Sequence, residues 1–504
     1  MRPLLFLSTL LMACAPKFPA GPVPFDRAKQ PVRFVEVPDP NHPNVYFQAL
    51  IAAGSARDPL GSEGVANLTA QALAEAGAGD RNSTEVRDAL YPTGNRLNVQ
   101  VDREWVSVRL RCHRDHQALC ASVFADVLTA PGFDPTDISR LRDDALYRVS
   151  EGLLGDEEAL GQETLDAVVF EGHPYGHPVA GRAGVLGLLD DADVRAFYDR
   201  TYVRESVWVG LAGAFEAKTR ETLAERLDEL PGVPAPELVL QSPLRVQGRS
   251  LQIVSTQTQV TGFHFAHPIS VTRDDPDWNA LTVAMTALGA HRQSFGRLFQ
   301  TLRTARGLNY GDYAYIESYS ERRGSSLPEQ GVLRQQPYFY VWIRPTSVEN
   351  GPFALKLAIA EIERLVTDGL APSEFEDVRA YLRGSLPLLA QDPGRRLAYA
   401  LDAAATDTPN PLTAFHAALE TLTVEDVNDA VRRHVNPETL RIVAVTGEAE
   451  TLKRRLLDPS ATPIVYNDVT PDEAQLQRDA EAAQWPLGLT EDTVWIAPAQ
   501  GLFQ

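Results

Sequence analysis

Residues 54–76 read GSARDPLGSEGVANLTAQALAEA, a polar turn region that passes into a helical repeat. The glycines, the aspartate and the proline of its first half predict a loop. Ser62 is placed to cap a helix that ends near Ala76, because apolar residues then recur at helical spacing. The apolar face consists of Val65, Leu68, Ala72, Leu73 and Ala76. The stretch therefore predicts a loop that leads into one buried helix.

Short strand patterns flank this helix on both sides. Strands are expected at 44–53, around the alternating Leu97, Val99 and Val101, at 105–110 and at 206–211, with mainly helical structure at 117–200. The second half repeats this order, with strands at 250–256, 262–268, 313–318, 338–345 and 441–445 and helices at 278–288, 295–306, 352–367 and from about 373. Repetition on this scale indicates an internal duplication. Strands interleaved with helix pairs predict an α+β chain whose antiparallel sheets are each covered by helices on one face.

Composition sets the expected domain boundaries. At ~150 residues per domain, a chain of 504 residues is expected to hold two to four domains. We expect a signal peptide at 1–13, a proline-rich tether at 14–30, a first domain at 31–230, a linker at 231–248, a second domain at 249–463 and an acidic, poorly ordered tail at 464–504.

The charge balance argues against some classes of partner. Acidic residues outnumber basic ones, 67 to 47, and the formal net charge is −20. Such a chain is not expected to bind nucleic acid or an anionic membrane surface as its main partner.

The first residues have the pattern of an export signal. Arg2 precedes a short apolar run from Leu4 to Met12, which is too short to cross a bilayer as a mature helix. The run ends in Leu-Met-Ala-Cys, which resembles a bacterial lipobox, so Cys14 is expected to carry a lipid. The alternative is an ordinary signal peptide with a chance cysteine. Because no aspartate follows Cys14, we expect an anchor in the cell envelope, at the periplasmic face of the outer membrane.

Two further cysteines occur in the segment RCHRDHQALC. Cys112 and Cys120 are expected to form a disulfide in an oxidising compartment or to remain as buried thiols. His113 and His116 lie between them, so a metal site is conceivable, but the spacing matches no standard zinc pattern.

Five segments resemble, in order along nearly the whole mature chain, the M16 (insulinase/pitrilysin-type) peptidases. They are GSARDPLGSEGVANL, FDPTDISRLRDDAL, GHPYGHPVAG, DVRAFYDRTYVRESVWVGLAGAF and GRLFQTLRTARGLNYGDYAY. The short bacterial two-domain members are the most similar kind. The resemblance implies two tandem homologous domains that form half of a clam-shell.

Active members of that family carry H-x-x-E-H on a helix, with two histidines that hold zinc and a glutamate that acts as general base. The matching positions here are Asn67, Ala70 and Gln71, and the third ligand, about 77 residues further on, falls at Tyr147 or Arg148. Amides are poor zinc ligands, and a methyl group cannot accept a proton. Because H-x-x-E-H occurs nowhere in the sequence, we expect no metal and no cofactor in this chain.

The second half keeps a different part of the family pattern. Its members carry an arginine and a tyrosine seven residues apart, which contact the substrate and the developing oxyanion at the zinc site. LRTARGLNY supplies Arg303 and Tyr310 at that spacing, with Gly307 expected to end the helix between them. Without the resemblance, a dipole-complementing arginine and a strand tyrosine would explain the pair equally well.

Three functions are compatible with this pattern. The first is the zinc-less subunit of a heterodimeric M16 metalloendopeptidase, which supplies Arg303 and Tyr310 in trans to a partner bearing H-x-x-E-H and zinc, with an unfolded peptide as substrate. The second is a catalytically inactive binding or assembly lipoprotein. The third is a solitary metalloprotease with unusual ligands, for which the CHRDH segment is the only candidate.

Overall fold

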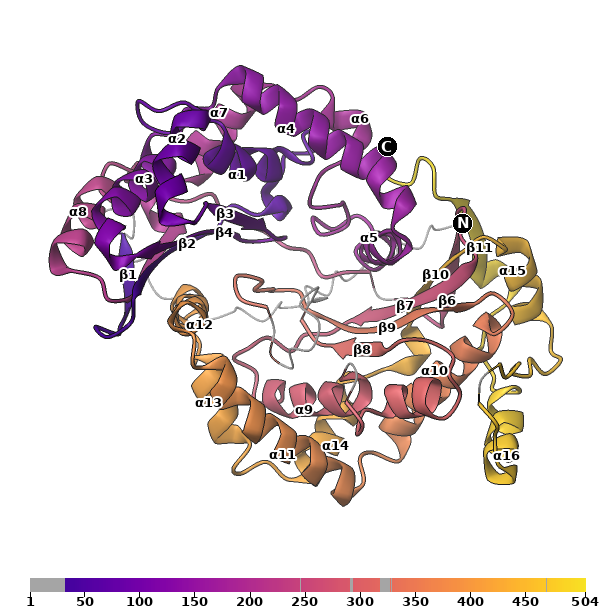
Figure 1. Ribbon diagram of the computed structural model, residues 1–504. Coiled ribbons are helices and arrows are strands. Elements are labelled where there is room, and N and C mark those ends of the chain that lie inside the picture. Colours follow the sequence, from indigo (N-terminus) through magenta and orange to yellow (C-terminus); the bar gives the residue numbers. More distant parts are fainter. Residues whose placement is uncertain (1–31, 245, 291–292, 318–326, 328, 468) are drawn as a thin grey trace, which may run out of the picture.

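The computed structural model describes residues 32–504 except 245, 291–292, 318–326, 328 and 468. Two sheets face one another, each with its own helices on the outer side (Figure 1). The expected α+β class and the two tandem homologous domains are confirmed. The proposed lipid site Cys14, the signal peptide and the tether at 14–30 lie outside the described residues.

The first sheet has the strand order β1 (Arg33–Pro38), β5 (Val207–Gly213), β2 (Asn44–Ile51), β4 (Val106–His113) and β3 (Asn98–Val101). The helices of this domain are α1 (Val65–Glu75), α2 (Ser83–Leu90), α3 (Gln117–Thr129), α4 (Pro135–Tyr147), α5 (Glu157–Val169), α6 (Ala183–Leu186), α7 (Asp191–Thr201) and α8 (Ala217–Leu227). The predicted face of α1 is buried along its whole length, because it packs on α4, α7 and β3.

The second sheet has the order β11 (Val494–Pro498), β6 (Ser250–Ser255), β10 (Arg441–Thr446), β7 (Val260–Pro268), β9 (Tyr338–Ser347) and β8 (Asp312–Tyr315). The helices here are α9 (Trp278–Gly289), α10 (Gly351–Thr367), α11 (Pro372–Leu389), α12 (Pro393–Thr406), α13 (Pro411–Ala418), α14 (Val424–His434), α15 (Ala449–Leu457) and α16 (Glu473–Ala482). Apart from β11, the strand order repeats that of the first sheet, as the predicted duplication requires.

The expectation that both sheets are antiparallel was wrong in one respect. β5 is parallel to β1 and antiparallel to β2, and β10 is likewise parallel to β6 and antiparallel to β7. The first two strands of each unit run in opposite directions. The last strand is inserted between them and must therefore be parallel to one of them, which makes each sheet mixed.

The two domains also exchange a helix, so each sheet is covered on both faces rather than on one. α5 of the first domain packs on β7 and β10, and α12 of the second half packs on β1, β2 and β5 (Figure 1). Glycine allows both close approaches. A side chain at Gly161 of α5 would collide with His264 of β7, and one at Gly210 of β5 would collide with Leu397 of α12.

The expected acidic tail of low order, 464–504, is instead a folded part of the molecule. It contains α16 and β11, and β11 pairs in parallel with β6 and satisfies the backbone groups of that sheet edge. Beyond β11, Phe503 is buried in the core of the first domain, and its carbonyl accepts a hydrogen bond from Ala183 N–H at 2.8 Å. The prediction relied on the overall acidic composition of this segment and gave no weight to the few apolar residues that pack it against the rest of the molecule.

None of the helices in the described part of the chain combines the length and the apolar character that crossing a membrane requires.

Candidate functional site

The helix that would carry the zinc ligands begins later than predicted, and Ser62 is not its N-cap. α1 starts at Val65 after Gly64, whose φ of 108° favours glycine. The carboxylate of Asp58 takes the place of a capping side chain, since it accepts hydrogen bonds from Gly64 N–H at 2.7 Å and Ala66 N–H at 2.8 Å. The loop before α1 therefore fixes the helix from six residues upstream.

The surroundings of this cap favour uncharged groups. The side chain of Asp58 is fully buried, and burial raises the pKa of its carboxyl to about 8, against the opposing effect of the two N–H donors. Nε2 of His177 lies 3.8 Å from Asp58 Oδ2, and burial lowers the pKa of this imidazole to about 4. Burial therefore disfavours the charged form of both groups at the start of α1.

The three positions predicted to match the zinc ligands and the general base carry no metal-binding or acidic side chain, and two of them are buried. Ala70 is completely buried, Asn67 is 7% exposed and Gln71 is partly exposed. The side chains on this face are two carboxamides and a methyl group. No imidazole or carboxylate at these three positions is available to bind a metal or activate water.

The third ligand position also carries no acid. Tyr147, the last residue of α4, is 67% exposed, and the exposed Arg148 begins the five-residue π-helix η5 (Arg148–Gly152). α4 packs beside α1, and Arg140 of α4 forms an ion pair of 3.0 Å with Glu75 of α1. The fold therefore brings α1 and α4 together, but the side chains at the positions predicted to match the family's zinc ligands cannot form a zinc site.

Arg303 and Tyr310 are brought together by a different local structure from the one predicted. The expected helix 295–306 is replaced around Arg303 by the π-helix η8 (Phe299–Thr304). Gly307 ends it as predicted, with φ of 64°, and its N–H donates to Arg303 O at 2.7 Å. The bond from Gly307 N–H to Arg303 O is that of an αL helix end, and Leu308 N–H reaches further back, to Leu302 O at 3.0 Å.

The chain reversal places the two side chains in contact at the surface. Cζ of Arg303 lies 4.0 Å from the centroid of the Tyr310 ring, within cation–π range. Nη1 of Arg303 also donates to Asn309 O at 2.9 Å, and Tyr310 remains 59% exposed. The pair therefore offers an oriented guanidinium and an adjacent phenol to a ligand.

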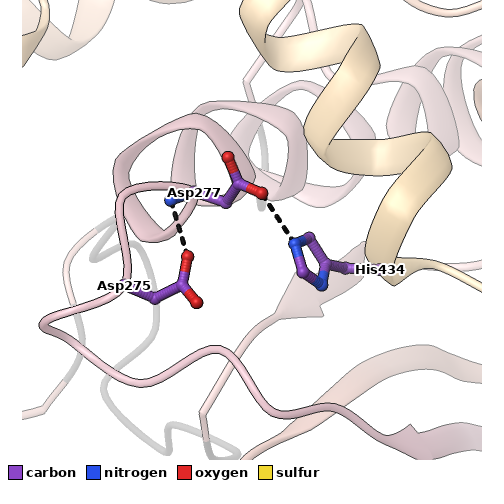
Figure 2. A group of neighbouring side chains, drawn as sticks. All are labelled: Asp275, Asp277 and His434. Carbon is purple, nitrogen blue, oxygen red and sulfur yellow. Dashed lines mark hydrogen bonds and ion pairs between the residues drawn. The ribbon is translucent and has the colours of Figure 1, made fainter.

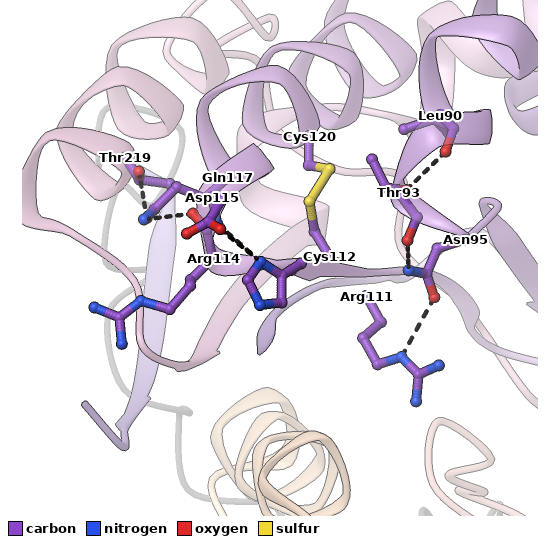
Figure 3. Close-up of a disulfide and its surroundings, with 11 residues drawn as sticks. Leu90, Thr93, Asn95, Arg111, Cys112, Arg114, Asp115, Gln117, Cys120 and Thr219 are labelled. Carbon is purple, nitrogen blue, oxygen red and sulfur yellow. Dashed lines mark hydrogen bonds and ion pairs between the residues drawn. A yellow bond between two sulfur atoms is a disulfide. The ribbon is translucent and has the colours of Figure 1, made fainter. Parts of the chain in front are cut away.

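Cys112 of β4 and Cys120 of α3 are joined by a disulfide in the structure (Figure 3). Both cysteines are completely buried, whereas His113 and His116 are exposed. Because each sulfur is bonded to the other, neither is available as a thiolate ligand for a metal. The disulfide fixes the end of β4 to the helix that follows it.

A group of possible metal ligands occurs elsewhere, at the start of α9. Within the described residues, Asp275, Asp277 and His434 have ligand atoms within 4.8 Å of one another (Figure 2). Asp277 is already engaged by His434 Nε2 at 2.7 Å and by Arg433 at 2.6 and 2.8 Å. The guanidinium supplies the positive charge that a cation would bring, so we interpret the group as an ion-pair network between α9 and α14.

Sequence reasoning missed a set of buried ion pairs, one of which joins the two domains. Arg334 of the second domain forms bonds of 2.7 and 2.8 Å with Asp102 in the β3–β4 turn. Arg103, beside it, binds Asp166 of α5 at 2.8 Å. Each arginine is far from its acidic partner in the sequence, so no rule based on residue spacing could have predicted these pairs.

The same arrangement recurs in the second domain. Arg273, in the β7–α9 loop, contacts Asp402 of α12 at 3.0 Å and Glu317 at 2.9 Å. Asp402 is the tenth residue of α12, as Asp166 is of α5. Each exchanged helix is thus anchored by a buried aspartate to an arginine of its own domain.

Comparisons with known proteins agree with this architecture. Residues 33–182 match the family described as insulinase (peptidase family M16), and residues 189–382 match the peptidase M16 inactive domain. An uncharacterised zinc protease of Mycobacterium bovis is 26% identical over 366 residues, 70% of this chain and 77% of that protein. A non-peptidase homologue of Helicobacter pylori is 20% identical over 449 residues, 87% of this chain and 98% of that protein.

A solved structure shows the same fold. The crystal structure of a peptidase M16 inactive domain from Pseudomonas fluorescens matches with a TM-score of 0.72 at 22% identity, covering 82% of this chain and 94% of that chain. The two matched segments follow one another along the chain, and the second extends from the end of the first domain into the second. The chain therefore belongs to the M16 peptidase family, and it is similar to the inactive, non-peptidase homologues in that family.

Proposed function

We propose that this chain is the non-catalytic subunit of a heterodimeric M16 metallopeptidase. Its partner would be a chain of similar size that bears H-x-x-E-H and holds zinc, and the two would cleave unfolded peptides. Arg303 and Tyr310 would contact the substrate backbone and the developing oxyanion at the partner's site. Zinc would belong to the partner alone.

One observation carries the proposal, namely the contrast between two surfaces of the same chain. The side chains on the α1 face cannot bind a metal, and Ala70 is sealed inside the core. The Arg303–Tyr310 pair, by contrast, is oriented by the Gly307 turn and is accessible, with its charged and aromatic groups 4.0 Å apart. A chain that had lost every role in peptide chemistry would have no need of so defined a pair.

The proposed location follows from the sequence. Lipidation at Cys14 would tether the chain through residues 14–30 to the cell envelope, at the periplasmic face of the outer membrane. The disulfide between Cys112 and Cys120 suits an oxidising compartment of this kind.

The decisive experiment isolates the chain with its native partners from membranes. Recovery of a homologous chain with H-x-x-E-H would support the proposal. The variant Arg303→Ala/Tyr310→Phe should then leave the complex assembled and reduce peptide cleavage by about 100-fold or more, as expected for lost oxyanion contacts. The matched control is Arg383→Ala/Tyr91→Phe, which changes an exposed arginine and a tyrosine that is 84% exposed, both far from the pair in sequence.

A binding or assembly protein without any role in catalysis is the second candidate. The near full-length match to a non-peptidase homologue favours it. Under this alternative the double variant would behave like the control. Stoichiometric zinc in the purified chain alone, together with peptide cleavage that a chelator stops, would contradict both functions.

A further inference from the structure

A pocket of about 410 Å³ lies where the first sheet meets the start of α12. Four arginines line it. Arg96 precedes β3, Arg109 and Arg111 belong to β4, and Arg395 lies in the first turn of α12. Among the lining residues only Asp392 is acidic. A chain with a net charge of −20 therefore concentrates positive charge in one pocket.

Strand alternation explains how the arginines gather. Arg109 pairs across the sheet with Gln48 on one side and with Asn98 on the other. Arg111 pairs with Tyr46, two residues along the same strand. Residues opposite or two apart share a face, so these side chains form one polar face, while the alternate residues of the strands are buried in the core.

Most of this positive charge is not neutralised within the molecule. Over the described ranges of the chain, no carboxylate lies within 4.0 Å of the guanidinium groups of Arg96, Arg111 or Arg395. Arg111 Nε donates only to the amide oxygen of Asn95, at 3.3 Å. Such arginines contrast with the buried Arg103, Arg273 and Arg334, each of which has an acidic partner.

The single acid in the pocket is already engaged. Asp392 Oδ1 accepts the N–H of Arg395 at 2.7 Å and so caps α12, and Oδ2 accepts the hydroxyl of Tyr46 at 3.3 Å. The pocket thus has several guanidinium groups available for anions from outside. Guanidinium groups bind carboxylates in a planar, two-point geometry.

The neighbouring strand indicates what kind of anion fits. β3 is the last strand in the order of the first sheet, and its first residue, Asn98, lines the pocket. An edge strand can pair with the backbone of an extended peptide, and the peptide's side chains then enter adjacent pockets. A peptide along β3 would bring its carboxylates to the arginines.

We propose that this pocket binds the acidic side chains of an extended peptide that lies along β3. The inference rests on the proposed function as a peptide-holding subunit, and it specifies the class of peptide as rich in aspartate and glutamate. Positively charged peptides would be disfavoured by the same arginines.

Binding of two fluorescent peptides to the complete mature chain tests this inference. One peptide is rich in aspartate and glutamate, and the other is its isostere with asparagine and glutamine. We expect the acidic peptide to bind about tenfold more tightly at low salt, as a few partly exposed ion pairs would give. The variant Arg96→Gln/Arg111→Gln/Arg395→Gln should bind both peptides equally.

The control variant Arg383→Gln/Arg432→Gln/Arg454→Gln makes the same change of net charge on exposed arginines outside the pocket. It should keep the preference for the acidic peptide. Equal binding of both peptides to the unmodified chain, or loss of the preference in the control, would overturn the inference. So would displacement of the acidic peptide by inorganic phosphate but not by chloride of equal ionic strength, which would assign the pocket to phosphate.

Activity of the native complex separates this inference from the proposed function. If the complex cleaves both peptides at the same rate and Arg303→Ala/Tyr310→Phe abolishes cleavage, the pocket has no such role and the proposed function stands. If Arg303→Ala/Tyr310→Phe leaves cleavage by the complex unchanged while the chain still binds the acidic peptide more tightly, the proposed function fails. The pocket is then a peptide-binding site with another role.

Discussion

The two domains of this chain share one topology, yet they differ in which side chains they leave available. In the first domain the position of the general base is a methyl group buried in the core, and the ligand positions are amides, an exposed tyrosine and an exposed arginine. In the second domain Arg303 and Tyr310 stand together at the surface after a defined turn. The two units therefore share one framework, whereas the side chains at their predicted sites differ in chemistry and exposure.

The first prediction has the largest expected effect. It tests whether the predicted site on α1 is inaccessible to solvent, in addition to lacking metal-binding side chains. Ala70→Glu would bury an unpaired carboxylate at a position with no exposed surface, so we expect a loss of about 4 kcal/mol in the free energy of unfolding. Gln71→Glu, on the next and partly exposed residue, should change it by less than about 0.5 kcal/mol. Urea unfolding of both variants measures the difference. Similar losses would show that α1 is still open to solvent.

A second test compares the anchors of the two exchanged helices. Asp402→Asn should lower the unfolding free energy by about 3 kcal/mol, because it weakens a buried ion pair with Arg273. Asp402 also accepts the N–H of Gly331 at 3.0 Å, whereas Asp166 Oδ1 has no hydrogen-bond partner. We therefore expect Asp166→Asn to cost less, about 1.5 kcal/mol. A larger loss for Asp166→Asn would reverse this ranking.

The third test concerns a covalent link described only in the first domain. Cys120→Ala removes the crosslink to Cys112, eight residues earlier, and should lower stability by about 2.5 kcal/mol through the greater freedom of the unfolded chain. Thermal unfolding with and without reductant measures the effect. The unfolding temperature of the variant should no longer change when reductant is added. A continued change would show that the Cys112–Cys120 disulfide is not the source of the reductant effect.

The smallest effect concerns acid sensitivity of the second sheet. His264 is completely buried, its Nδ1 lies 2.6 Å from the Tyr340 hydroxyl, and burial lowers its pKa to about 3. Its folded pKa lies below the unfolded value of about 6.5, so the unfolded chain binds the extra proton and stability falls as pH drops from about 6.5 to about 3. His264→Gln should remove about 2 kcal/mol of that loss. Unfolding curves at pH 6.5 and 4.5 would measure it, and equal losses in both proteins would exclude His264 as a source.

Local patterns in the sequence were sufficient for much of the fold. Short strand patterns predicted β2 and β9, helical spacing predicted the buried face of α1, and the extent of α9 was also predicted. Gly307 was correctly predicted to end its helix, because a positive φ after a helical run is a local requirement.

Features that depend on distant partners could not be predicted in this way. The true cap of α1 is Asp58, which acts through a loop rather than from the adjacent position. The parallel pairing of β10 with β6 and the exchange of α5 and α12 involve contacts between segments far apart in sequence. The arginine-lined pocket likewise combines residues from both halves, and only the folded chain brings Arg395 to Arg111.

The burial of Phe503 in the first domain has a consequence for biosynthesis. The core of that domain, whose first strand is β1, includes Phe503 from the segment that follows β11, and its sheet is covered by α12. A nascent chain on the ribosome or in a translocation channel cannot complete this core before α12 and Phe503 have emerged. Deletion of residues 499–503 should therefore destabilise the part of the polypeptide that is synthesised first.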